Sequence, residues 1–243
     1  AIMAKYILEA HKNAGTLPEN AALCKSIVST DLVTKIAESY GATMFNVLTG
    51  FKFIAEKIQE FEEKHNHTYM MGFEESFGYL IKPFVRDKDA IQAVLVVAEL
   101  AAYYRSRGLT LADGIEEIYK EYGYYAEKTI SVTLSGVDGA EQIKAIMAKF
   151  RNNAPKEWNA TAITVVEDFK AQTATAADGT VTNLTTPPSD VLKYTLADGS
   201  WIAVRPSGTE PKIKFYIAVV GETNEKSQAK IANIEAEINA FVG

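Results

Sequence analysis

The sequence is poor in the residues that disulfide frameworks and metal sites require. It has a single cysteine, Cys24, in 243 residues, and its three histidines, His11, His65 and His67, show no ligand spacing. A disulfide framework and a cysteine or histidine metal site are therefore excluded. A lone cysteine inside an apolar segment suits a reducing compartment, so we expect a cytoplasmic protein.

Long apolar runs and blocks of positive charge are also lacking. Residues 90–102 are interrupted by Gln92 and Glu99, and no stretch approaches the roughly 20 apolar residues of a membrane span. We expect no signal peptide. The net charge of -6 argues against a general nucleic-acid surface. We therefore expect neither nucleic acid nor membrane as a partner, and any anionic ligand must be bound locally.

Strand and helix patterns alternate through residues 1–123. Strands are expected at 21–28, 44–48 and 69–71, and helices at 1–11, 32–41, 53–65, 87–107 and 110–123. This order predicts an N-terminal three-layer α/β domain with a mostly parallel sheet. The first helix has no cap residue and no initiator methionine ahead of it, so we expect the chain to be a piece of a longer one.

The order of elements changes after residue 123. Strands are expected at 130–134, 162–169, 191–196, 201–205 and 213–219, helices at 140–151 and 224–241, and a long surface excursion at 171–188. This pattern predicts a smaller α+β domain over residues 124–243, with a mostly antiparallel sheet and two helices on one face.

Three polar loops follow the strands of the first domain. They contain Ser29 and Thr30, Thr49, and Glu74 to Ser76. Because ligands bind beyond the carboxyl ends of parallel strands, we expect these loops to converge on one crevice. Adjacent side chains of an extended loop point to opposite sides, so Glu74 and Ser76 share a side that Glu75 does not. A carboxylate can accept hydrogen bonds from two sugar hydroxyls, which makes Glu74 and Ser76 candidate sugar-binding residues; a solvated loop is the alternative.

The loop between the last two strands combines a cation, hydroxyls and a glycine. Gly208 can adopt a positive φ that lets successive N–H groups converge, Ser207 and Thr209 add hydroxyls, and Arg205 supplies a planar fork for phosphate oxygens. Strand alternation places Arg205 and Lys214 on one face beside this loop. An ordinary polar hairpin turn is the alternative. The two cations favour a phosphate site.

Lys88 lies between Asp87 and Asp89 at the expected start of a long helix. There the positive helix end and the neighbouring Arg86 disfavour a protonated amine, so Lys88 is a candidate general acid or base near neutral pH. A solvated lysine in a charged first turn is the alternative.

Two loops resemble those of one enzyme family. Residues 205–217, Arg-Pro-Ser-Gly-Thr-Glu-Pro followed by Lys-Ile-Lys-Phe-Tyr-Ile, resemble the phosphate-binding loop in the last domain of the phosphoglucomutase/phosphomannomutase (phosphohexomutase) family. Residues 72–78, Gly-Phe-Glu-Glu-Ser-Phe-Gly, resemble the sugar-recognition loop of its third domain. The resemblance covers essentially the whole chain and implies the third and fourth domains. Phe77-Gly78 in place of Gly-His favours the bacterial phosphoglucomutase branch.

The resemblance implies an isomerase that interconverts glucose 1-phosphate and glucose 6-phosphate through a phosphoserine and glucose 1,6-bisphosphate. It implies a hexose phosphate as substrate and Lys88 as the residue that shuttles the hydroxyl proton. The binding residues that it implies are Thr49, Glu74 and Ser76 for the sugar, and Arg205, Ser207, Gly208, Thr209 and Lys214 for the phosphate. Alternatives are a phosphomannomutase, a phosphoglucosamine mutase, or a non-catalytic sugar-phosphate-binding protein.

Two motifs of the family do not occur in this sequence. They are the Ser-His motif of the phosphoserine and the Asp-x-Asp-x-Asp loop that holds Mg²⁺, both of which belong to earlier domains. The run Asp87-Lys88-Asp89 has too few carboxylates for a hard octahedral cation. The resemblance therefore implies that the partner of this chain is the N-terminal part of the same enzyme, that the metal is bound there, and that the chain alone is inactive.

Overall fold

The chain folds as two compact units, Ala1–Gly123 and Tyr124–Gly243. A computed structural model describes residues 1–134, 138–208 and 210–242. Each unit buries a hydrophobic core of its own.

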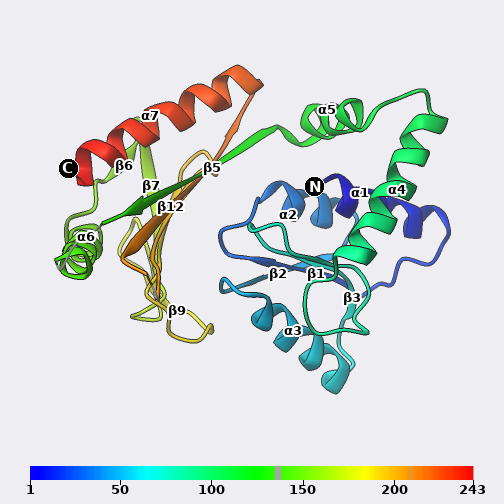
Figure 1. The fold of residues 1–243 in the computed structure, drawn as a ribbon, viewed down its shortest axis with the longest axis horizontal. Coiled ribbons are helices and arrows are strands. Elements are labelled where there is room, and N and C mark those ends of the chain that lie inside the picture. The colour runs from blue at the N-terminus through cyan, green and yellow to red at the C-terminus, as the bar shows by residue number, and fades with distance from the viewer. Residues whose placement is uncertain (135–137, 209, 243) are drawn as a thin grey trace. The chain divides into compact units, whose positions relative to one another are not determined.

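Unit 1 has three layers, with helices on both faces of a four-stranded sheet (Figure 1). The strands lie in the order β2-β1-β3-β4; β1 pairs in parallel with β2 and β3, and β4 is antiparallel to β3. The predicted three-layer α/β domain is confirmed, and the short strand β4 was not predicted. The elements are α1 (Ile2–Asn13), β1 (Ala21–Ser26), α2 (Leu32–Ser39), β2 (Thr43–Val47), α3 (Phe51–Lys64), β3 (Thr68–Phe73), β4 (Tyr79–Leu80), α4 (Ala90–Ser106) and α5 (Leu111–Tyr122).

The hydrophobic pattern explains why these layers form. Every residue of β1 is buried, as expected for a central parallel strand that is covered on both faces. The buried residues of α3 recur at intervals of three and four, which gives the helix one apolar stripe against the sheet: Phe51, Ile54, Ile58 and Phe61. The expected start of α4 at Asp87 is wrong, because Asp89 caps the helix and α4 begins at Ala90.

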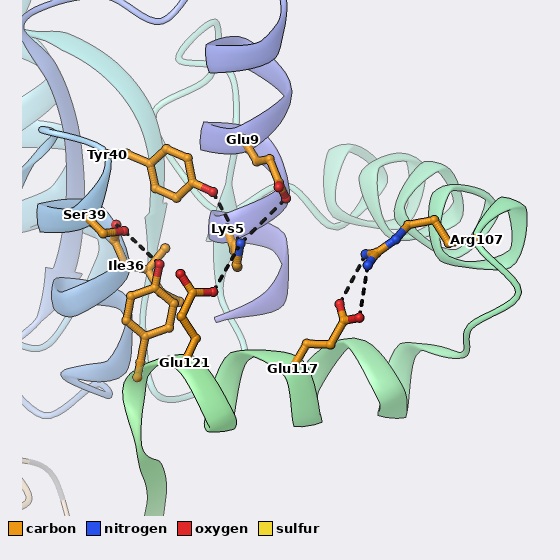
Figure 2. Close-up of polar contacts among 9 residues, drawn as sticks. Lys5, Glu9, Ile36, Ser39, Tyr40, Arg107, Glu117 and Glu121 are labelled. Carbon is orange, nitrogen blue, oxygen red and sulfur yellow. Dashed lines mark hydrogen bonds and ion pairs between the residues drawn. The ribbon is translucent and has the colours of Figure 1, made fainter.

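A cluster of polar side chains connects α1 to the C-terminal ends of α2 and α5 (Figure 2). The Lys5 ammonium lies 3.7 Å from Glu9 and 3.6 Å from Glu121, and it donates a hydrogen bond to Tyr40. Burial works to lower the pKa of Lys5, but the bond to Tyr40 and the two carboxylates raise it. The ammonium is therefore charged in the folded protein, and the cluster serves the packing of these helices.

Unit 2 is an antiparallel sheet with two helices on one face (Figure 1). The strand order is β5-β12-β11-β10-β7-β8-β9, and β6 pairs with β7 beside this path. Residues from α6, α7 and the same face of β11 and β12 form the core. The elements are β5 (Tyr124–Thr133), α6 (Gly139–Asn153), β6 (Glu157–Trp158), β7 (Thr161–Asp168), β8 (Thr173–Ala176), β9 (Val181–Asn183), β10 (Leu192–Leu196), β11 (Trp201–Pro206), β12 (Lys212–Gly221) and α7 (Asn224–Val242).

The predicted α+β class of the second half is confirmed, with two corrections. The predicted surface excursion over residues 171–188 contains β8 and β9, which extend the sheet beyond β7. Strand β5 begins at Tyr124 instead of Ile130, because its full length pairs with the long strand β12.

Candidate functional site

The polar loops of unit 1 leave the sheet at one edge. The parallel register pairs Ser26 of β1 with Val47 of β2, and Lys25 of β1 with Phe73 of β3. The three strands therefore end side by side, and the loops that follow them start from the same edge. Thr49 is half-buried and lies two residues after the end of β2.

The loop that carries Glu74 and Ser76 is a tight connection between β3 and β4. The Glu74 N–H donates to the Gly78 carbonyl oxygen at 3.0 Å, which closes the loop. Phe77 adopts a φ of 63° and exposes 86% of its surface, and Ser76 is exposed as well. The Glu75 carboxylate accepts a hydrogen bond from the buried Ser26 hydroxyl at 2.6 Å. Glu75 is thus bound to the end of β1.

Glu74 and Lys88 lie next to one another over Gly78. A Cβ atom at Gly78 would lie 2.7 Å from Glu74 Oε1 and 2.9 Å from Lys88 Cδ, so the absence of a side chain there makes room for both. The Lys88 ammonium donates to Asp87 Oδ1 at 2.9 Å. This arrangement places an exposed ammonium beside a half-buried carboxylate, which is a suitable pair for binding hydroxyl and phosphate oxygens.

The predicted electrostatics of Lys88 are wrong. The hydrogen bond to Asp87 raises the pKa of Lys88, and the nearby negative charge of Glu74 adds to that effect. The reason is local: Lys88 precedes the helix, and the Arg86 side chain forms an ion pair with Glu62. Lys88 therefore holds its proton at neutral pH and can act as a hydrogen-bond donor or general acid.

In unit 2, Arg205 and Lys214 lie directly opposite one another on β11 and β12. Both side chains are half-buried, and no ion pair of either is found in the part of the chain that the structure describes. Like charges that face each other across two strands destabilise a sheet. A bound anion would remove that repulsion, whereas the neighbouring Lys212 is already paired with Glu210 at 3.0 Å.

The hairpin tip beside this pair is held by its own hydrogen bonds. The Ser207 N–H donates to the Lys212 carbonyl at 2.7 Å, and the Glu210 N–H donates to Ser207 Oγ at 3.3 Å. Gly208 does not use the positive φ that a glycine can adopt, since its φ lies outside the left-handed region. Thr209, the remaining predicted phosphate-binding residue, lies outside the described residues.

Ser207 and Gly208 line an open cavity of about 390 Å³ together with Ile143 and Met147 of α6. Because these two α6 residues belong to the helix-covered core face, this cavity is on the helix side of the sheet. Arg205 and Lys214 face the other way, because their neighbours Val204 and Ile213 point into that core. The structure therefore does not gather all the predicted phosphate-binding residues into one cavity.

The described residues do not fit a magnesium site. No group of three or more histidine, cysteine, aspartate or glutamate residues that could hold a metal ion is found among residues 1–134, 138–208 and 210–242. Asp87 is bonded to Lys88, and Asp89 accepts hydrogen bonds from the N–H groups of Ile91 and Gln92. Over the same residues, no helix has the length and apolar character to cross a membrane.

The sequence analysis did not identify Lys25 and Ser26 as residues that hold the loops at this end of the sheet. The Lys25 side chain is fully buried, and its ammonium lies 2.8 Å from Asp31 Oδ1. A lysine inside an apolar strand was the available signal, because a charged residue is almost never fully buried without a partner.

Comparisons with known proteins agree with these two units. The family model described as Phosphoglucomutase/phosphomannomutase, alpha/beta/alpha domain III matches residues 1–122, and that of the C-terminal domain matches residues 137–240. A phosphoglucomutase of Staphylococcus aureus (strain bovine RF122 / ET3-1) is 40% identical over 198 residues, which cover 81% of this chain and 35% of that protein. A phosphoglucomutase of Staphylococcus haemolyticus is 36% identical over 96% of this chain and 41% of its own length.

Solved structures share the fold. The Paramecium phosphoglucomutase pp63/parafusin aligns with a TM-score of 0.63 and 20% identity, over 98% of this chain and 41% of that chain. A Thermus thermophilus protein described as a phosphomannomutase aligns with a TM-score of 0.59 and 15% identity, over 98% of this chain and 40% of its own. The chain thus spans well under half the length of these relatives. It belongs to the phosphoglucomutase/phosphomannomutase family, and its two units correspond to domain III and the C-terminal domain.

Proposed function

We propose that this chain is the sugar- and phosphate-binding part of a phosphoglucomutase that interconverts glucose 1-phosphate and glucose 6-phosphate. The observation that carries the proposal is the pair Arg205 and Lys214, two half-buried cations placed opposite each other without an acidic partner among the described residues. Family membership and relatives that are named phosphoglucomutase support it.

In this proposal unit 2 binds the phosphate group that does not react. Arg205 contributes a planar fork and Lys214 a second positive charge from one face of the sheet. Ser207 and Gly208 border the cavity on the other face, so in this proposal they and Thr209 would reach the same phosphate only at the hairpin tip. A Cβ atom at Gly208 would meet nothing within 4 Å, and its φ is ordinary. Neither packing nor backbone conformation requires glycine there, which supports close approach of a ligand to the backbone as the reason for it.

Unit 1 binds the sugar. Glu74 accepts hydrogen bonds from two ring hydroxyls, and Ser76 and Thr49 add hydroxyl contacts from the same sheet edge. Lys88, protonated at neutral pH, acts as the general acid and donates its proton to the sugar oxygen from which the phosphoryl group departs. Catalysis of this type depends mainly on positioning and charge neutralisation, which both units would supply.

In the complete enzyme, a phosphorylated serine outside this chain would transfer its phosphoryl group to the free O1 or O6 of the hexose phosphate. Glucose 1,6-bisphosphate would form, reorient and return its other phosphoryl group to the serine. Since the described residues do not fit a magnesium site, the ion would be held by other domains, and the chain alone would be inactive. Cys24, a buried free thiol, is in keeping with a cytoplasmic enzyme.

The exposed face of α4 supports those other domains as partners. Ile91 is 83% exposed, and Val94 and Leu95 are each 69% exposed on the same side of the helix. Apolar patches of this kind are normally covered by a partner surface. In the complete enzyme, Leu95→Asp should lower activity, whereas in this chain alone it should leave sugar-phosphate binding unchanged.

Calorimetric titration of this chain with glucose 1-phosphate and glucose 6-phosphate tests the proposal. Arg205→Ala and Lys214→Ala should each weaken binding by about 10-fold to 100-fold, because a hydrogen bond to a charged group contributes about 1.5–3 kcal/mol. The matched control is Lys128→Ala, which removes a lysine of the same sheet that is paired with Glu235. Equal affinities for wild type and both variants would contradict the phosphate site. Mannose 6-phosphate and glucosamine 6-phosphate test the related sugars.

A further inference from the structure

A chain of buried hydrogen bonds connects the end of β1 to the loop that carries Glu74. Ser26 Oγ donates to Glu75 Oε2 at 2.6 Å, and Ser26 Oγ and Ser29 Oγ are 2.9 Å apart. A hydroxyl has one proton, so Ser29 must donate to Ser26 when Ser26 donates to the carboxylate. Ser26 exposes 1% of its surface and Ser29 4%. The bond to Glu75 is thus charge-assisted, and its donor is shielded from water, which strengthens it.

The donor side of this chain is itself fixed. The fully buried Lys25 ammonium donates to the Ser29 carbonyl at 3.0 Å and lies 2.8 Å from Asp31 Oδ1. An unpaired buried ammonium would be costly, so this pairing holds the segment from Ser29 to Asp31 in one position. The Ser26 hydroxyl, which donates to Glu75, is therefore hydrogen-bonded to a segment that is itself held in place.

The loop on the acceptor side needs such support. Phe77 is a bulky residue in the left-handed region, a conformation that costs free energy and persists only when surrounding contacts impose it. The Phe77 side chain is 86% exposed and can contribute little packing. Within the loop, the Glu74 N–H bond to Gly78 is a backbone contact, whereas the Glu75 side chain supplies a link to another strand.

We propose that Glu75 and Ser26 are positioning residues for the sugar-binding loop. The bond between them fixes Glu75 against the end of β1 and so holds the tight turn in which the Glu74 carboxyl lies beside Gly78 and Lys88. This inference rests on the proposed function, in which Glu74 and Ser76 contact the sugar. Neither Glu75 nor Ser26 touches the sugar or the phosphate in this proposal; both act through the conformation of residues 74–78.

Three variants of the full chain test the role. Glu75→Ala and Ser26→Ala each remove one partner of the bond, and Glu75→Gln keeps an oxygen that accepts from Ser26. Glu56→Ala, an exposed glutamate on α3, is the matched control. The first readout needs no ligand: hydrogen exchange of the Glu74 amide, which donates to Gly78, measured by NMR.

We expect Glu74 exchange to accelerate about 10-fold or more in Glu75→Ala and Ser26→Ala, and to stay within about 3-fold of wild type in Glu75→Gln and Glu56→Ala. Backbone amides of β1 should exchange as slowly as in wild type, which distinguishes local opening of residues 74–78 from general unfolding. If Glu75→Ala fails to fold, Ser26→Ala carries the test, since it removes only one hydroxyl. Unchanged Glu74 exchange in a folded Ser26→Ala variant would overturn the proposal.

The second readout compares how much each variant loses in affinity for two different ligands. Glucose 6-phosphate should bind Glu75→Ala and Ser26→Ala about 10-fold more weakly, while inorganic phosphate, a probe for the Arg205 loop, should bind as it does to wild type. Equal loss for both ligands would contradict a role in the sugar loop. If Glu74 exchange accelerates as expected but wild type binds no sugar phosphate, the positioning role of Glu75 and Ser26 is supported and the proposed function fails.

Discussion

The substitution Gly78→Ala separates the sugar-binding geometry of unit 1 from its stability. The new methyl group would lie 2.7 Å from Glu74 Oε1, and 2.9 Å from Glu74 Cγ and Lys88 Cδ, which is closer than real contacts permit. The atoms that it meets belong to flexible side chains, so Glu74 and Lys88 should swing away while the backbone stays in place. The φ of Gly78 lies outside the left-handed region, and alanine adds no backbone strain.

The expected magnitudes follow from these contacts. Loss of a hydrogen bond from a sugar hydroxyl to the Glu74 carboxylate removes about 1.5–3 kcal/mol, which is a weakening of about 10-fold to 100-fold in affinity. Displaced side chains that reach solvent should change the free energy of unfolding by only about 0.5 kcal/mol. Gly72→Ala should do the reverse, because its Cβ would lie 2.5 Å from Tyr69 Oη and 2.7 Å from Ile54 Cγ2. Overpacking of such a buried position costs about 1–3 kcal/mol.

Calorimetry with glucose 6-phosphate and urea denaturation of the same preparations measure both quantities. Glu74→Ala and the double variant Glu74→Ala/Gly78→Ala complete a cycle. If the methyl group acts by displacing Glu74, the double variant should bind no more weakly than Glu74→Ala. Wild-type affinity in a folded Gly78→Ala variant, or additive losses in the cycle, would refute the placement of Glu74 in the site.

Three further predictions concern stability and reactivity. Burial raises the pKa of the Cys24 thiol to about 12, so Cys24 should resist iodoacetamide at pH 8 until urea unfolds the chain. The free energy that the protonated, buried thiol contributes to folding should be lost as the pH rises above its unfolded pKa, about 8.5. Thr110→Ala removes the capping box with Asp113 and should cost about 1 kcal/mol by urea denaturation. Burial works to raise the pKa of Asp168, but the Arg151 hydrogen bonds lower it overall. The contribution of Asp168 to stability is therefore present above its unfolded pKa, about 3.9, and is lost in acid. In Arg151→Leu, the free energy of unfolding should fall less between pH 7 and pH 3 than it does in wild type.

The parts of the fold that the sequence predicts are those set by local periodicity. Strand β1 is apolar enough to be read as a buried parallel strand, and the alternation from Trp201 to Lys214 predicts that Arg205 and Lys214 share a face. The register confirms that they are direct cross-strand partners. Strands β8 and β9 were missed because these short segments contain a single large apolar residue, Val181, and are stabilised by pairing with β7 and with each other.

The charge state of Lys88 could not be predicted because it depends on where α4 begins. Asp87 and Asp89 are both good cap residues, and the sequence does not choose between them. In the structure, Asp89 accepts the N–H groups of Ile91 and Gln92, which leaves Asp87 available to Lys88. A shift of two residues in the helix start therefore reverses the direction of the pKa change.

The same dependence on tertiary contacts decides which charges are available to a ligand in both units. Adjacent or near-adjacent like charges occur twice in the predicted loops, as Glu74 with Glu75 and as Lys212 with Lys214. In each pair one member is already bonded inside its unit, since Glu75 accepts a hydrogen bond from Ser26 and Lys212 forms an ion pair with Glu210. The other member, Glu74 or Lys214, has no side-chain hydrogen bond or ion pair among the described residues. Because the partner Ser26 lies 49 residues from Glu75, only the fold can identify the member that remains for the ligand.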